Sequence, residues 1–281
     1  MSDELEPTRN DSEPETLAST DPGRGSELEL LSGGRHAKYR RFVLAALGSI
    51  PWVGGLLGAI SGLDAEKAQE RLNSLHHQWI QEHHERLQEL GAAISEITGR
   101  LESIGGADER VQSDEYLGLV RYGFRTWDHA ATSEKRKLVQ QLLSNAGGTR
   151  LVSDDVVRLF IEWIDKYHEA HFAVIREIHR RPGITRFDIW QSIRGSHPRE
   201  SSAEADLFKL LIRDLSTGSV IRQHRETDYA GNFLPKKKSS RKGAPKKMKS
   251  AFDDSEQYEL TELGKQFVHY AMTDLVPRIG G

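Results

Sequence analysis

The feature that most constrains the fold is a run of 22 residues, 42–63, that contains no charged side chain. As one straight helix this run would be about 33 Å long, which is enough to cross the hydrocarbon core of a bilayer. Pro51 and the pair Gly54-Gly55 favour a break near its middle, and each remaining piece of about 13 Å is too short to cross alone. Basic residues between 35 and 41 would also hold the preceding flank in the cytoplasm. The run therefore predicts an apolar hairpin rather than a single membrane span.

Such a hairpin needs an apolar environment, and the sequence leaves two alternatives open. It packs inside a helical bundle or an oligomer, or it inserts into a membrane conditionally. The N-terminus lacks the basic and apolar run of a secretory signal, and the chain has no cysteine. We therefore expect a cytoplasmic protein, with inner-membrane association as the alternative. The side chains expected to make the membrane or oligomer contacts are Phe42, Leu47, Ile50, Trp52, Val53, Leu56, Leu57 and Ile60.

Two segments of opposite charge are predicted to be disordered. Residues 1–33 contain nine acidic side chains and two arginines, a net charge of −7. Residues 235–250 contain eight lysines or arginines and no acidic residue, a net charge of +8. Both segments are too polar to offset the entropy lost on ordering. The basic segment also points to an acidic partner such as nucleic acid.

A long amphipathic helix is predicted to follow the apolar run. From Leu87 to Ile104, apolar residues recur at alternating steps of three and four, which places them along one side of a helix. We predict one helix over residues 64–104, ended by Gly105-Gly106. Its apolar seam must be buried, either against another helix of this chain or against a second copy. Self-association into a homo-oligomer is therefore expected as one of two alternatives.

Three further helices complete a predicted helical bundle over residues 34–170. The first spans about 113–130, with apolar residues at helical spacing, and the second spans about 133–145. Gly147 and Gly148 are interpreted as the signal that ends the second helix. The third begins at a Ser153 cap and continues toward residue 168.

The pattern changes from residue 171 onward. Three short amphipathic helices, the last from residue 202 or 203 to Gly218, precede two predicted strands, SVIRQHRE and QYELT, and a final helix. This order, and the phrase LIRDLSTGSVIRQ … YELTELGKQFV, resemble the winged-helix domain of bacterial transcription regulators. The predicted fold class is therefore mainly α: an apolar hairpin, a long helix and a bundle, followed by a C-terminal winged-helix (α+β) domain over 171–281.

The winged-helix resemblance implies contact with nucleic acid, DNA more than RNA, through the third helix and the wing. Three acidic residues at the start of that helix, Glu200, Glu204 and Asp206, would face phosphates and argue against sequence-specific readout in the major groove. Carboxylates at a helix start also interact favourably with the helix dipole, so a purely structural role is the alternative interpretation of these three residues. The candidate contact residues are Arg199, Lys209, Arg213, Arg222, His224, Arg225, Lys236, Lys237, Lys238, Arg241, Lys242, Lys246, Lys247 and Lys249.

No sequence motif indicates catalysis. The chain lacks a phosphate-binding GxxxxGK[ST] loop, a dinucleotide-binding glycine pattern and a GxSxG nucleophile motif. His168 and His171 have the spacing of a helical ligand pair, but the sequence offers no second half of a metal signature. We predict a non-enzymatic protein with no cofactor and no metal.

Short apolar phrases, IPWVGG, EKRKLVQQLLSNAG and LTELGKQF, faintly resemble the abortive-infection alpha family of bacterial phage-defence proteins. This resemblance transfers no catalytic residue, but it implies a role in defence or stress. Our first hypothesis is a self-associating protein that binds DNA or RNA through a basic wing. The alternative is a membrane-active effector whose hairpin, residues 42–63, inserts on triggering while the winged helix acts as a sensor. The third hypothesis is a scaffold protein whose winged helix contacts only other proteins.

Overall fold

The computed structural model describes residues 38–55, 70–105, 108–196, 198–225, 228–230, 234 and 250–272. The predicted acidic tail, the first residues of the predicted long helix (64–69) and the lysine-rich part of the basic insertion (235–249) lie outside the described residues. So do three of the predicted membrane or oligomer contacts, Leu56, Leu57 and Ile60.

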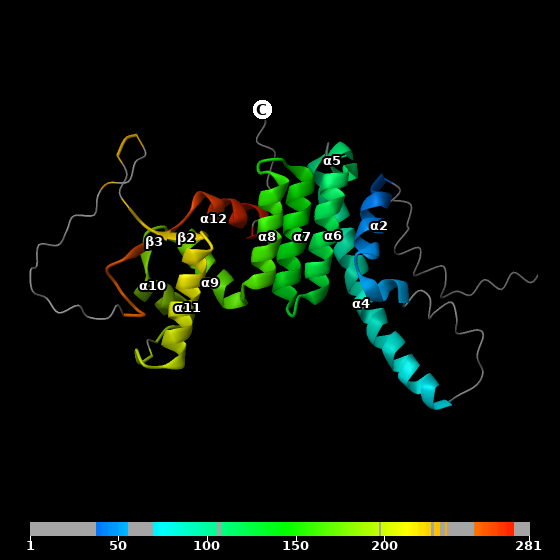
Figure 1. Cartoon of the computed structure of the whole chain (residues 1–281), viewed down its shortest axis with the longest axis horizontal. Helices are drawn as coiled ribbons and strands as arrows, with labels where there is room; N and C mark the ends of the chain where they lie inside the picture. The colour runs from blue at the N-terminus through cyan, green and yellow to red at the C-terminus, as the bar shows by residue number, and fades with distance from the viewer. Residues whose placement is uncertain are drawn as a thin grey trace, which may run out of the picture.

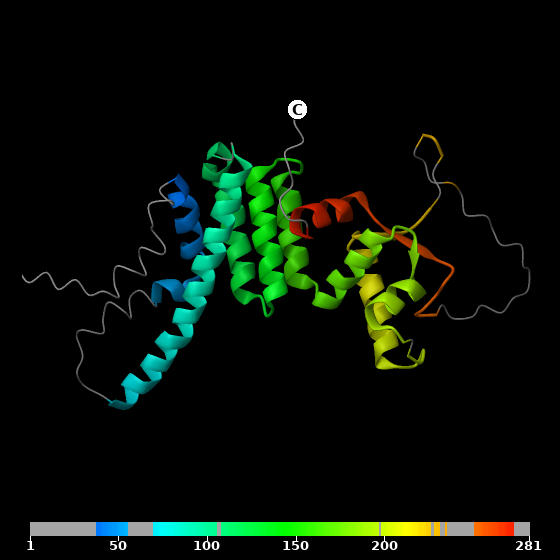
Figure 2. The same cartoon turned by 180° about the vertical axis from the view of Figure 1, so that it is seen from behind.

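The described part of the chain is mainly helical, as predicted, and helix α7 lies at the centre of its bundle (Figure 1). Helices α4, α6 and α8 pack directly on α7, and α2 packs on α6. The N-terminal part of α4 extends past the other helices in both views (Figures 1 and 2). The elements are α2 (Arg40–Gly48), α4 (Glu70–Ile104), α5 (Asp108–Gln112), α6 (Asp114–His129), α7 (Ser133–Gly148) and α8 (Asp154–Lys166).

The predicted apolar seam of α4 is buried within this chain over its C-terminal half. Leu87, Leu90, Ile94, Ile97 and Leu101 are all buried in the core, where α7 is the principal neighbour of α4. For these residues the intramolecular alternative is therefore confirmed, because no second copy is needed to cover them.

Helix α7 is longer than the sequence predicted. Gly147 and Gly148, interpreted as the end of the helix, belong to its last turn. A Cβ atom on Gly147 would lie 2.7 Å from Leu101 Cδ2, and one on Gly148 would lie 2.5 Å from Ile104 Cδ1. Side chains of α4 therefore lie close against the glycine backbone of α7, and the helix ends at Gly148, three residues later than the predicted Asn145.

The apolar run begins as two helical pieces, but the break lies earlier than predicted. Helix α2 ends at Gly48, residues 49–50 form a turn, and residues 51–55 are helical again. Pro51 therefore begins the second piece, a position where its missing N–H removes no helical hydrogen bond. Of the predicted contact residues, Phe42, Ile50 and Val53 are buried in this chain's own core, and Leu47 and Trp52 are partly buried against it.

Trp52 holds the second piece onto the bundle through a buried carboxylate. Its indole Nε1 donates a hydrogen bond to Oδ1 of Asp128 on α6 (2.8 Å), and the Arg86 guanidinium on α4 donates to the same oxygen (2.7 Å). The guanidinium also lies 5.3 Å from the centroid of the Trp52 ring.

Among the described residues, no helix combines the length and the apolar character that a membrane crossing requires.

A second, smaller group of elements follows the bundle and carries a three-stranded antiparallel sheet in the order β1-β3-β2. Strand β1 pairs Ile184 with Tyr258, and β2 pairs Ile221 with Leu260. The two longer strands were predicted, whereas β1 was not, because Thr185 was predicted only as the start of the following helix. The elements are α9 (Glu169–Arg180), β1 (Ile184–Thr185), α10 (Arg186–Arg194), α11 (Ala203–Thr217), β2 (Ile221–Gln223), β3 (Gln257–Leu260) and α12 (Glu262–Phe267), which continues into a π-helical turn, Val268–Met272.

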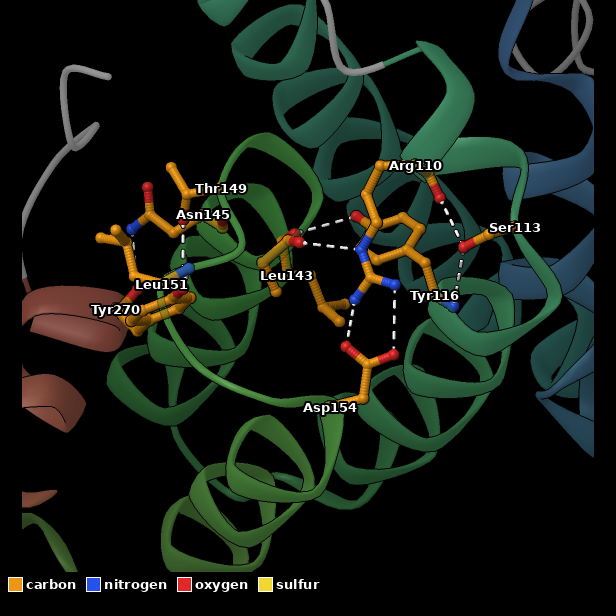
Figure 3. Close-up of polar contacts among 10 residues, drawn as sticks. Arg110, Ser113, Tyr116, Leu143, Asn145, Thr149, Leu151, Asp154 and Tyr270 are labelled. Atoms are coloured by element: carbon orange, nitrogen blue, oxygen red, sulfur yellow. Dashed lines mark hydrogen bonds and ion pairs between the residues drawn. The ribbon is translucent and has the colours of Figure 1, made fainter. Parts of the chain in front are cut away.

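The final π-helical turn joins this group to the buried end of α7 (Figure 3). Asn145 Nδ2 donates to the carbonyl oxygen of Tyr270 (2.8 Å). The Tyr270 hydroxyl accepts from Leu151 N and is hydrogen-bonded to Thr149 Oγ1, both at 3.1 Å. These bonds satisfy buried polar groups on both partners, so they fix the position of the last turn against the bundle.

We expect the buried carboxylate beneath Trp52 to be essential for stability. Replacing Asp128 by Ala leaves the Trp52 N–H and part of the Arg86 guanidinium without their acceptor, which costs about 2–3 kcal/mol of unfolding free energy. The matched control is Asp114→Ala on the same helix, because Asp114 pairs with Arg41 in an exposed ion pair and its loss costs less than about 1 kcal/mol. Urea unfolding followed by circular dichroism measures both values, and equal losses in the two variants would contradict the prediction.

Candidate nucleic-acid interface

A groove of about 590 Å³ lies between α11, β2 and the start of α10. Five of the eleven residues that line it are arginine or lysine, and none of the eleven is acidic. The groove is therefore a basic surface formed by three elements that are separated in sequence. The lining residues are Arg186, Lys209, Ile212, Arg213, Ser216, Thr217, Ile221, Arg222, Gln223, Arg225 and Tyr258.

Helix α11 supplies one wall of the groove. The helix begins at Ser202, whose Oγ accepts a hydrogen bond from Ala205 N (3.2 Å), as the sequence predicted. Lys209 and Arg213 are four residues apart, so both side chains lie on the same face of the helix. The Arg213 side chain is 72% exposed and that of Lys209 is 35% exposed, so both are accessible from solvent.

Strands β2 and β3 form the opposite wall and orient Arg222. The strand register places Arg222 opposite Glu259, whose carboxylate accepts from Arg222 Nε (2.7 Å) and is hydrogen-bonded to His224 Nδ1 (2.8 Å). Burial raises the pKa of Glu259, but the hydrogen bonds from His224 and Arg222 outweigh that effect, and the net pKa is lowered. The carboxylate therefore stays ionised near neutral pH and fixes the direction of the guanidinium.

The fifth cation of the groove, Arg186, was missed by sequence reasoning. Its Nε donates to the hydroxyl oxygen of Tyr258 (2.8 Å), and its guanidinium lies 5.3 Å from the centroid of the Tyr258 ring. Tyr258 faces Ile184 across the β1–β3 pair, so the two-residue strand β1 brings Arg186 to the groove. The sequence does carry a signal for this strand, because the two residues before α10, Ile184 and Thr185, are both β-branched. Two residues are too few to predict a strand.

The structure brings together four of the predicted contact residues in this groove: Lys209, Arg213, Arg222 and Arg225. Arg199 is exposed and lies outside the groove lining. His224 contacts Glu259 at the edge of the sheet. The remaining candidates, Lys236, Lys237, Lys238, Arg241, Lys242, Lys246, Lys247 and Lys249, lie outside the described residues.

The three acidic residues at the start of α11 differ in their surroundings. The Glu200 carboxylate accepts hydrogen bonds from Ala251 N (2.9 Å) and from the Ser250 hydroxyl, and these bonds lower its pKa. Glu204 is fully exposed, and hydrogen bonds at the helix start lower its pKa, which agrees with the helix-capping interpretation. The expectation that all three carboxylates face phosphates therefore needs correction for Glu200, whose oxygens are engaged by protein donors.

A larger cleft of about 1200 Å³ lies between other residues of α11 and the bundle. Its lining contains Lys135 and Arg176, but also Glu134, Asp165 and Glu169. Arg176 forms an ion pair with Glu134, and burial lowers the pKa of Lys135. Because charges of both signs line this cleft, it favours a polyanion much less than the basic groove does.

A buried histidine lies behind α11. His171 is 3% exposed, its Nδ1 accepts from His168 N (3.1 Å), and its Nε2 lies 3.8 Å from Oδ2 of Asp214 on α11. The ring stacks on Tyr167 with 4.9 Å between centroids. Burial lowers the pKa of His171, and the neighbouring His168 acts in the same direction while Asp214 opposes it.

No family model, curated protein or solved structure matches this chain. In the part of the chain that the structure describes, no three histidine, aspartate or glutamate side chains gather closely enough to hold a metal ion. The basic groove is therefore the best-defined candidate site, and its function has to be inferred from its own chemistry.

The lowered pKa of His171 predicts a loss of stability in acid. The unfolded chain binds a proton at this residue near pH 6.5, whereas the folded protein does so only at lower pH. The contribution of neutral His171 to the unfolding free energy is therefore fully present above about pH 6.5. It decreases at lower pH, by at most about 1.4 kcal/mol per pH unit. His171→Gln keeps an acceptor for His168 N but cannot titrate, so its unfolding free energy should fall less between about pH 7.5 and pH 5.5. Chemical denaturation at both pH values measures the difference, and identical losses would contradict it.

Proposed function

We propose that the protein binds nucleic acid, DNA in preference to RNA, through the basic groove formed by α10, α11 and β2. The observation that carries this proposal is the convergence of five cations on a groove without an acidic lining residue. Phosphate groups suit such a surface, because arginine matches their geometry with two parallel hydrogen bonds and lysine acts as a point charge.

The order of the elements supports a winged-helix unit as the framework for this groove. Helices α9, α10 and α11 precede the antiparallel pair β2–β3, and α12 follows it. In that framework α11 is the third helix, and the segment between β2 and β3 is the wing. Lys209 and Arg213 on α11 and Arg222 on β2 then face the same ligand from the helix and from the base of the wing.

The distribution of charge along α11 favours contacts to the phosphate backbone over reading of bases. The cations occupy the middle and C-terminal half of the helix, whereas Glu204 and Asp206 are exposed in its first turn. A recognition helix contacts base edges mainly through its N-terminal residues, and carboxylates there are repelled by phosphates. We therefore propose binding that depends strongly on salt and weakly on sequence. The lysines of residues 235–249 would add to this affinity from the wing.

Charge reversal on the exposed face of α11 tests the proposal. If the five groove cations each neutralise one phosphate, affinity for a short DNA duplex should fall about 10²–10³-fold between about 50 mM and 200 mM salt. The double substitution Lys209→Glu with Arg213→Glu should weaken binding at least about tenfold at low salt, because it replaces two attractions by repulsions. Fluorescence anisotropy with a labelled duplex gives both quantities.

The matched control is Arg180→Glu on α9. The Arg180 side chain is 72% exposed and pairs with Glu177, as Arg213 is 72% exposed and pairs with Asp214, but Arg180 lies outside the groove. The control changes the net charge by half as much as the double substitution does, and we expect it to alter affinity less than about threefold. Salt-independent binding, or equal effects at both places, would refute the proposed site.

A further inference from the structure

The turn before α11 holds a carboxylate that joins two segments separated by about fifty residues in sequence. Glu200 Oε2 accepts a hydrogen bond from Ala251 N (2.9 Å), and Glu200 Oε1 accepts one from the Ser250 hydroxyl. Lys209 Nζ lies 3.5 Å from the same Oε2 atom. One exposed acidic side chain therefore contacts both a groove cation and the chain segment that returns toward β3.

The returning segment is fastened to α10 and α11 at this point. Ala251 is fully buried, and the ring of Phe252 is stacked on Phe208 of α11 with 5.9 Å between centroids. Phe252 also packs against Trp190 of α10 (5.3 Å). Glu200 supplies the polar contacts of this junction, and the aromatic rings supply its apolar contacts.

The position of Ser250 in the chain gives this junction its importance. Ser250 directly follows Lys249 in the sequence, and Lys249 is the last cation of the basic insertion. Glu200 also lies beside Lys209, which lines the groove. Glu200 therefore contacts both Ser250–Ala251 and a groove cation, Lys209, which also lies 3.8 Å from Oδ1 of Asp206.

We propose that Glu200 is a positioning residue for nucleic-acid binding. This inference rests on the proposed function. Glu200 increases affinity although its charge has the same sign as a phosphate, because it holds Lys209 and the end of the basic insertion in place before the ligand arrives. Preorganised contacts lose less entropy on binding than contacts that must be ordered by the ligand.

The positioning role and simple electrostatic repulsion predict opposite changes in affinity when the Glu200 side chain is truncated. If Glu200 only repelled phosphates, removing its charge would tighten binding, whatever residue replaced it. If it positions the segment, the outcome depends on whether the replacement keeps the hydrogen bonds. Gln can accept from Ala251 N and donate to the Ser250 oxygen, whereas Ala can do neither.

The test compares three variants of the full chain by fluorescence anisotropy with a DNA duplex at low salt. Glu200→Ala should weaken binding about fivefold or more, which is within the effect of losing hydrogen bonds to a charged group. Glu200→Gln should bind as tightly as the wild type or more tightly. Glu204→Ala is the matched control, because it removes one charge from the same region without contacting residues 250–251, and it should bind no more weakly than the wild type.

Amide hydrogen exchange at Ala251, without any nucleic acid, reports on the junction itself. Exchange should accelerate in Glu200→Ala and stay slow in Glu200→Gln, while α11 keeps its protection in both. Tighter binding by Glu200→Ala, or unchanged exchange at Ala251 in that variant, would overturn the positioning role. If the wild type itself fails to bind duplex, the proposed function fails and the positioning role with it. The exchange result then still shows whether the junction exists.

Discussion

The structure depends on burying the C-terminal end of α7. The last carbonyl groups of a helix have no partner within it, so a buried helix end must find donors elsewhere. One turn before this end, Tyr116 on α6 donates its hydroxyl to the carbonyl of Leu143 (2.8 Å), and burial raises the pKa of Tyr116, so this hydroxyl stays protonated. Arg110 donates to the carbonyl of Ala146 (3.4 Å) and pairs with Asp154 of α8 (Figure 3). Each donor belongs to a different neighbour of α7, so satisfying this end also assembles the bundle around it.

The same helix end determines where the candidate interface lies. Tyr270, in the π-helical turn that continues α12, is bonded to Asn145 and Thr149, so α12 and the sheet that precedes it are attached to the bundle. Helix α9 contacts β3, α10 and α11, and its Arg176 pairs with Glu134 of α7. The groove is therefore built on elements that the bundle holds from two directions, and a ligand meets cations that are already oriented. At the opposite side of the bundle, Trp52 and Asp128 hold the apolar run in the same manner.

Local patterns predicted the helices well, whereas contacts between distant residues escaped prediction. Ser153 and Ser202 precede α8 and α11 as predicted, although only the Ser202 side chain makes a capping hydrogen bond, and the seam of α4 follows from its heptad spacing. Strand β1 and Arg186 were missed because two residues form a strand only when β3 lies beside them. Gly147 and Gly148 were predicted to end α7, and the helix does end at Gly148, but the close packing of α4 side chains against these glycines is a contact between distant residues that the sequence did not indicate. Glu200 was interpreted from its charge alone, since its donors are about fifty residues away.

If the protein binds nucleic acid as proposed, the ligand lies in the groove between α11 and β2. The most direct measurement is two-dimensional nuclear magnetic resonance of the ¹⁵N-labelled full chain, titrated with a short DNA duplex at low salt. We expect the largest shifts at Lys209, Arg213 and residues 221–223, and in the side-chain Nε–H signals of Arg186 and Arg222. Shifts confined to α2, α4 or the bundle, with these signals unchanged, would contradict it.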